Sequence, residues 1–137
     1  MKKTIRLLSL LLVLVMLTTA LTACGEKNIP TEDDFIQVLT DLGYTDQIIE
    51  VSDEEHGLIK ARGLLLYGTE ESEVMPLYAM YIRYSDKDTA ASAEAKLKEN
   101  SEGSEYIKIK RDNNIVFAII ANGDGVETAK RIWDNIK

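Results

Sequence analysis

The alternation of apolar and polar positions first predicts an amphipathic helix that begins after Thr31. Its apolar residues recur every three or four positions and form one stripe, which consists of Phe35, Val38, Leu39 and Leu42. Thr31 is suited to cap the helix, acidic residues fill its first turn, and Gly43 is suited to end it. The stripe predicts that the helix packs against the rest of the domain.

Four segments rich in aliphatic and aromatic residues predict two antiparallel hairpins. Residues 58–67 and 74–84 form the first hairpin, and residues 105–111 and 115–121 form the second. The last segment is apolar on both faces, which is typical of an interior strand. Residues 47–57 hold only a short apolar patch, which we interpret as an irregular stretch with at most one extended piece.

Two further helices are predicted from capping residues and small or apolar stripes. Ser85 with Asp88 matches a capping pattern, and a narrow face of Ala90, Ala93 and Leu97 follows it, so this helix can approach a sheet closely. A final helix begins after Asp124. Its inward face is expected to hold Val126, Ala129, Trp133 and Ile136.

The order of elements is therefore α-β-β-α-β-β-α, which predicts an α+β fold in which a four-stranded antiparallel sheet carries helices on one face. The chain has 137 residues, enough for one domain of ordinary size after a leader. We expect a signal peptide at residues 1–23, a lipidated tether at 24–30 and a single α+β domain at 31–137.

The leader begins with three basic residues within its first six positions, and an almost unbroken apolar run follows at residues 7–17. This pattern is typical of a secretory signal. The apolar run is shorter than the roughly 20 residues that a transmembrane helix prefers, although residues 7–23 together would almost span a bilayer as a retained anchor. Small or polar residues end the run before Cys24, the one cysteine of the chain.

The segment Leu21-Thr22-Ala23-Cys24 resembles the lipobox of bacterial lipoproteins. The resemblance implies that the Cys24 sulfur receives a diacylglyceryl group, that signal peptidase II cuts before it, and that the domain is anchored to the cell membrane on its extracytoplasmic face. Two acyl chains hold a protein on a bilayer durably, whereas one is marginal. The alternative for Cys24 is a free or buried thiol after ordinary secretion.

The chain also resembles small uncharacterised lipoproteins of Gram-positive bacteria. The pattern is a helix with "Thr-x-x-x-Phe…Gly-Tyr", then a strand ending in "Ser-x-x-x-x-Ala"; here the helix residues are Thr31, Phe35 and Gly43-Tyr44. Ser85 and Ala90 supply the second part. That group has no agreed activity, so the resemblance implies a location at the membrane but no particular reaction.

The formal net charge of −7 becomes −10 once the three basic residues of the leader are removed. A chain with this much negative charge repels nucleic acid, and no long run of basic residues offsets the repulsion. We therefore expect no nucleic-acid partner. The composition is otherwise that of a folded domain, with 45% hydrophobic residues.

His56 is the single histidine, within the acidic run Asp53-Glu54-Glu55-His56. It is the basis of an alternative function, a small envelope hydrolase or metal-dependent enzyme that uses His56 and the nearby acids. A solvated loop is the simpler interpretation, because no second histidine completes a zinc site and no Gly-x-Ser-x-Gly motif is present. We therefore expect no catalytic residue, metal or cofactor.

Aromatic residues and methionine gather on the first hairpin, where Tyr78, Met80, Tyr81 and Tyr84 are a candidate partner surface for an envelope protein or an apolar small ligand. The alternative is that these residues belong to the core. The expected function is a non-enzymatic binding or accessory module of unknown ligand, held at the membrane through Cys24.

Overall fold

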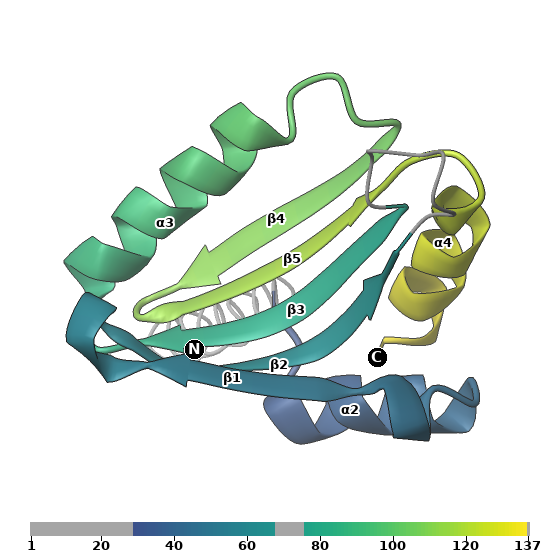
Figure 1. Cartoon of the computed structure of the whole chain (residues 1–137), viewed down its shortest axis with the longest axis horizontal. Helices are drawn as coiled ribbons and strands as arrows, with labels where there is room; N and C mark the ends of the chain where they lie inside the picture. Colours follow the sequence, from purple (N-terminus) through teal and green to yellow (C-terminus); the bar gives the residue numbers. More distant parts are fainter. Residues whose placement is uncertain (1–28, 68–75, 137) are drawn as a thin grey trace, which may run out of the picture.

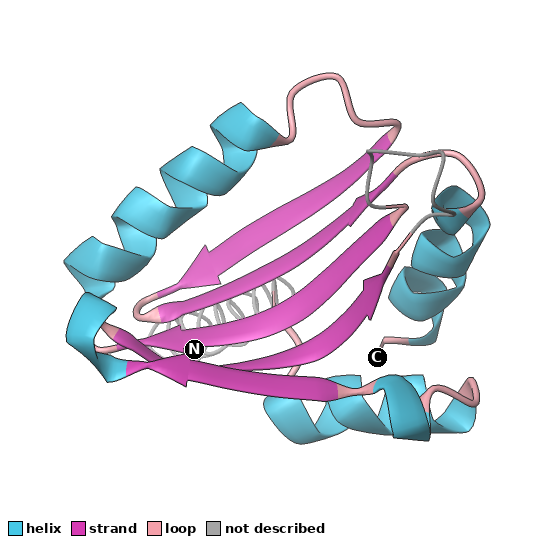
Figure 2. Ribbon diagram, in the orientation of Figure 1, coloured by secondary structure: helices cyan, strands magenta, loops and turns pink. Residues whose placement is uncertain are grey.

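The computed structural model describes residues 29–67 and 76–136. The predicted signal peptide, Cys24 and residues 24–28 of the predicted tether lie outside these ranges. Figures 1 and 2 show the arrangement of the elements. In chain order they are α2 (Glu32–Asp41), η1 (Thr45–Gln47), β1 (Ile49–Asp53), η2 (Glu54–His56), β2 (Leu58–Leu66), β3 (Leu77–Tyr84), α3 (Lys87–Asn100), β4 (Tyr106–Asp112), β5 (Ile115–Ala121) and α4 (Gly125–Asn135).

The five strands form one antiparallel sheet in the order β1-β2-β3-β5-β4. The α+β class, the antiparallel strand pairing of both hairpins and the interior position of β5 are confirmed. Residues 74–75 of the predicted second strand lie outside the described ranges. The prediction of four strands is wrong, because the stretch before residue 58 contains a fifth strand, β1, which pairs with β2 from Ile49↔Gly63 onward. The alternation of Ile49 and Val51 with polar neighbours covers only five residues, too few to distinguish a strand from a loop.

Helices cover both faces of the sheet. α2 and α4 pack on one face, called here the α2–α4 face, whose core includes Phe35, Leu64, Phe117 and Ile132. α3 packs on the other, the α3 face, through Ala90 and a second group of buried residues, Ala61, Met80, Ile82 and Val116. The prediction that all helices lie on one face is wrong. Strands β3 and β5 are apolar on both sides, and each side needs cover from water.

Aromatic rings hold α2 and α4 against the sheet. The Phe35 ring meets the Phe117 ring edge to face at a centroid distance of 5.0 Å. The Trp133 ring stacks on Phe117 at 6.3 Å, and the Lys108 ammonium lies 5.2 Å from the Trp133 ring centroid. The predicted inward face of α4 omits Ile132, which is fully buried, whereas Trp133 is only partly buried at the margin of the core.

The caps of two helices match or correct the predictions. Thr31 caps α2, because its hydroxyl accepts a hydrogen bond from the Asp34 amide at 3.2 Å. The cap of α3 is Asp86, not Ser85: its carboxylate accepts from the Thr89 amide at 2.7 Å. The sequence offers Ser85 and Asp86 side by side, and the stronger acceptor occupies the cap.

The start of α4 fits closely against the start of β3. A Cβ atom added to Gly125 would overlap the backbone carbonyl of Pro76, so this first helical position has room only for glycine. Asp124 precedes it in the N-cap position, as predicted, although its side chain makes no capping hydrogen bond. Among the described residues, none of the helices has the length and apolar character needed to cross a membrane.

Candidate functional site

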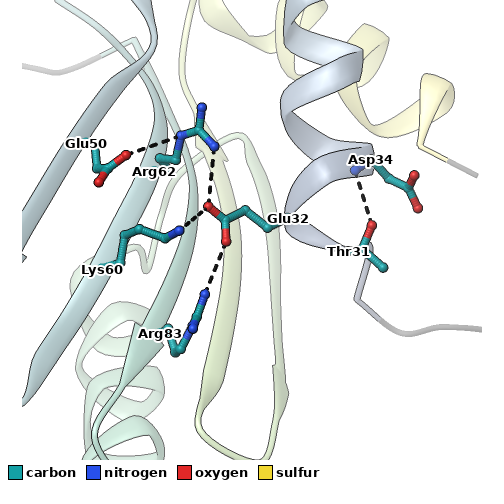
Figure 3. A network of polar contacts seen from close by, with 7 residues as sticks. All are labelled: Thr31, Glu32, Asp34, Glu50, Lys60, Arg62 and Arg83. Carbon is teal, nitrogen blue, oxygen red and sulfur yellow. Dashed lines mark hydrogen bonds and ion pairs between the residues drawn. The ribbon is translucent and has the colours of Figure 1, made fainter.

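The densest set of polar contacts in the described chain surrounds Glu32, the first residue of α2 (Figure 3). Its carboxylate lies 2.7 Å from the Lys60 ammonium and 3.3 Å from the Arg83 guanidinium. The Arg62 guanidinium lies 3.4 Å away, and it also lies 3.5 Å from Glu50. We call these five residues the Glu32 cluster.

The sheet register brings the three basic residues together. Lys60 and Arg62 are two positions apart on β2 and so point to the same face, and Arg83 lies opposite Lys60 on β3. The Thr31 cap fixes the first turn of α2 and so places the Glu32 side chain above them. The cluster therefore joins the first helix to two strands that follow it in sequence.

Electrostatics keeps Glu32 ionised. Its side chain is only 15% exposed, and this burial taken alone raises the pKa of the carboxyl; the hydrogen bonds and charges of Lys60 and Arg62 outweigh it, so the net pKa is lowered. A carboxylate whose pKa is lowered in this way is ionised near neutral pH and is poorly suited to transfer protons there. Asp33 and Asp34 add further acidic charge to the same helical turn. Because the contacts of the cluster link α2 to β2 and β3, we assign it a structural role in fixing α2.

His56 lies at the end of β1, in η2, where it pairs with Asp53. Its Nδ1 lies 2.8 Å from an Asp53 carboxylate oxygen, and its side chain is 77% exposed. Within the described ranges, no group of three His, Cys, Asp or Glu residues could hold a metal ion. The nearby Ser85 hydroxyl bonds Asp86 at 3.3 Å, so it is not engaged with this imidazole.

The four residues of the candidate partner surface do not share one face. Tyr78, Met80 and Tyr84 point to the α3 face, whereas Tyr81 belongs to the core of the α2–α4 face. Met80 and Tyr81 are buried, which matches the core alternative, and Tyr78 and Tyr84 are partly buried. Burial, with a smaller contribution from Tyr84, raises the pKa of Tyr78 to about 12.

Among the residues that the structure describes, the most exposed large apolar side chains lie elsewhere. Val51 on β1, Ile59 on β2 and Ile107 on β4 are 48%, 39% and 41% exposed, and Tyr67 at the end of the described β2 segment is more so. Val51 and Ile107 lie on the two strands at the ends of the sheet. This pattern could not be predicted because residues 47–57 were interpreted as an irregular stretch and no strand from it was placed in the sheet.

The Glu32 cluster was also missed by sequence analysis. Its cations were visible as Lys60 and Arg62 two positions apart within an apolar strand, but nothing in the sequence indicated their partner on α2, 28 residues earlier. Comparison with protein-family models, with curated proteins and with solved structures finds no match to this chain.

Proposed function

We propose that the chain is a membrane lipoprotein, anchored on the extracytoplasmic face through Cys24, whose folded domain is a non-enzymatic binding or accessory module. The leader pattern and the lipobox resemblance support the anchor. The lone cysteine immediately follows the segment that a signal peptidase would remove.

The observation that carries the proposal is how soon the packed domain begins after Cys24. Ile29 already packs against the core of the α2–α4 face and Pro30 is buried. Only residues 25–28 separate Ile29 from the cysteine, and the five steps from Cys24 to Ile29 span at most about 18 Å at 3.3–3.6 Å each. A lipid on Cys24 would hold the domain directly at the bilayer surface, which suits a module that meets other envelope components.

The test compares the chain with its Cys24→Ser variant in a bacterium that processes lipoproteins. The unchanged chain should partition into detergent, and its intact mass should match a product that starts at residue 24 and bears acyl chains. The variant should carry no acyl chains, because the sulfur that receives them is absent, and it should keep the circular dichroism of the folded domain. An unchanged chain whose mass shows no lipid, or a Cys24→Ser product that still bears acyl chains, would contradict the anchor.

The Asp53–His56 pair supports a second candidate function, a hydrolase, because the carboxylate orients the imidazole as a general base requires. The exposure of His56 and the engagement of Ser85 elsewhere favour the binding module. A panel of ester, peptide and phosphoester substrates tests this. Hydrolysis that the His56→Ala variant loses would support the enzyme and contradict the non-enzymatic assignment.

A further inference from the structure

Two strands of the sheet have a neighbour on one side only. β1 pairs with β2 and β4 pairs with β5, and these are the two ends of the sheet within the described chain. β4 keeps an unbroken register with β5 from Tyr106↔Ala121 to Asp112↔Ile115, with no bulge. A regular end strand presents outward amide and carbonyl groups that another strand can bind.

The side chains of the two end strands match in polarity. Ile49 and Val51 on β1 point to the α3 face, as do Ile107 and Ile109 on β4. Val51 and Ile107 are about half exposed, at 48% and 41%. Each end strand thus offers an apolar row on the same face of the sheet.

The charges of the two strands are opposite. β1 carries Glu50 and Asp53, whereas β4 carries Lys108, Lys110 and Arg111 and ends at Asp112. Asp53 already pairs with His56 and Arg111 with Glu94, so the opposite charges left to meet between copies are those of Glu50 and Lys108. Glu50 is 60% exposed although it lies near Arg62. A basic end strand on an acidic chain with net charge −7 is complementary to the acidic end strand of the same molecule.

We propose that β4 of one molecule pairs with β1 of a second copy, head to tail, and extends the sheet across the two. β1 and β4 run in the same direction within the sheet, because each is separated from β3 by one intervening antiparallel strand. A second copy placed alongside without reversal therefore forms a parallel pair and keeps its α3 face on the same side. One register matches the three positions that precede the irregularity of β1 between Val51 and Asp53: Ile49 with Ile107, Glu50 with Lys108 and Val51 with Ile109; Ser52 then comes near Lys110.

Pairing two copies through the same strand, β4 with β4 or β1 with β1, matches fewer side chains in polarity and charge. An antiparallel β4–β4 pair centred on Ile109 places Lys108 opposite Lys110, and like charges directly opposite each other are destabilising. An antiparallel β1–β1 pair that places Ile49 opposite Val51 places Glu50 opposite Glu50 of the second copy, again like charges. The head-to-tail register is the arrangement that joins apolar to apolar and acid to base.

The helices next to the two end strands lie on opposite faces. α3 packs against β3, β5 and β4 on the α3 face, while α2 packs on the other face towards β2. Figure 1 shows α3 on the β4 side of the sheet and α2 on the β1 side. A strand added to β4 lies beside α3 on the α3 face, and α3 of the first copy is then near the exposed Val51 of the second.

Cross-linking of the full chain, produced in a lipoprotein-processing bacterium and purified in detergent, tests the register. Ser52→Cys and Lys110→Cys are introduced together and treated with a short bis-maleimide; the chain without either substitution reports any reaction of Cys24. The double variant should yield a ladder of dimers and larger species, and each single variant should match the control. No cross-linking in the double variant, or equal dimer from Lys110→Cys alone, would overturn the proposal.

Charge exchange in the double-cysteine chain provides the second measurement. Glu50→Lys or Lys108→Glu alone converts an attractive cross-strand pair into a repulsive one, which should lower the association constant about two- to thirty-fold. Combining both substitutions restores an acid opposite a base between copies and should restore the ladder. If the combined variant associates no better than the single ones, the register is refuted; circular dichroism checks that each variant is folded.

Discussion

Replacement of Glu32 by glutamine isolates the charge of the carboxylate that links α2 to the sheet. The side chain keeps its size and its place after the Thr31 cap, but three cations lose their shared anion. An exposed ion pair contributes about 0.2–1 kcal/mol. Glu32 is mostly buried while its partners are 30–43% exposed, so we expect a total loss of about 2 kcal/mol in the free energy of unfolding.

The loss should depend on pH in a defined direction. The pKa of Glu32 is lowered in the folded state, so the unfolded chain binds the extra proton first as pH falls. The stabilisation is therefore complete above the ordinary value of 4.5 and disappears as pH falls through the folded-state pKa. The stabilities of the chain and of Glu32→Gln should differ most near neutral pH and converge in acid.

Urea unfolding followed by the fluorescence of Trp133, the one tryptophan of the chain, measures both effects. The Trp133 ring stacks on Phe117, which also contacts Phe35 of α2. Its fluorescence therefore reports the unfolding of the core between α2, α4 and the sheet. Asp33→Asn is the matched control, because it removes an exposed carboxylate from the same helical turn and should cost under about 1 kcal/mol. Equal losses in the two variants, or a Glu32→Gln difference that persists unchanged in acid, would refute this role of the cluster.

Two other substitutions test the packing. Gly125→Ala should destabilise the domain by about 1–3 kcal/mol, because the added Cβ would overlap the Pro76 carbonyl. The control is Lys130→Ala, an exposed position on the same helix, which should change the free energy of unfolding in urea by under about 0.5 kcal/mol. Equal stability of the two variants would count against close contact between α4 and β3. Tyr78→Phe should make the domain lose less stability as the pH is raised. Burial raises the pKa of Tyr78 from 10.0 to about 12 in the folded domain. The unfolded chain therefore loses this proton first, and the stability of the unchanged domain falls between these two pH values. Unfolding midpoints measured from pH 9 to 12 should decline less in the variant, and identical declines would show that Tyr78 ionises as readily in the folded domain.

Strong local signals predicted much of the fold. The stripe from Phe35 to Leu42 predicted α2 nearly to the residue, and the predicted break after residue 111 and before residue 115 matches the separation of β4 from β5 at Asn113 and Asn114. β1 was missed because its alternation is brief and its stability comes from pairing with β2, a contact that only the tertiary structure provides. The position of α3 was wrong for a related reason: the sequence shows that a helix has a small-residue face, but not which side of a sheet that face covers.

The candidate sites fared unevenly for the same physical reasons. Consecutive residues on a strand point in opposite directions, so the choice of both Met80 and Tyr81 for one surface conflicted with the strand predicted there. The Glu32 cluster depends on residues brought together from α2, β2 and β3. Charge at single positions was visible in the sequence, but its convergence was not.

The core of the α2–α4 face draws Phe35 from near the beginning of the domain and Ile132 from near its end. A chain that emerges from a ribosome or a translocation channel N-terminus first makes α2 long before α4. Until the last turns of the polypeptide have passed, the apolar stripe of α2 lacks part of its cover, and long-range closure of this kind is slow. Folding of this core should therefore be a late event, completed only after α4 has emerged.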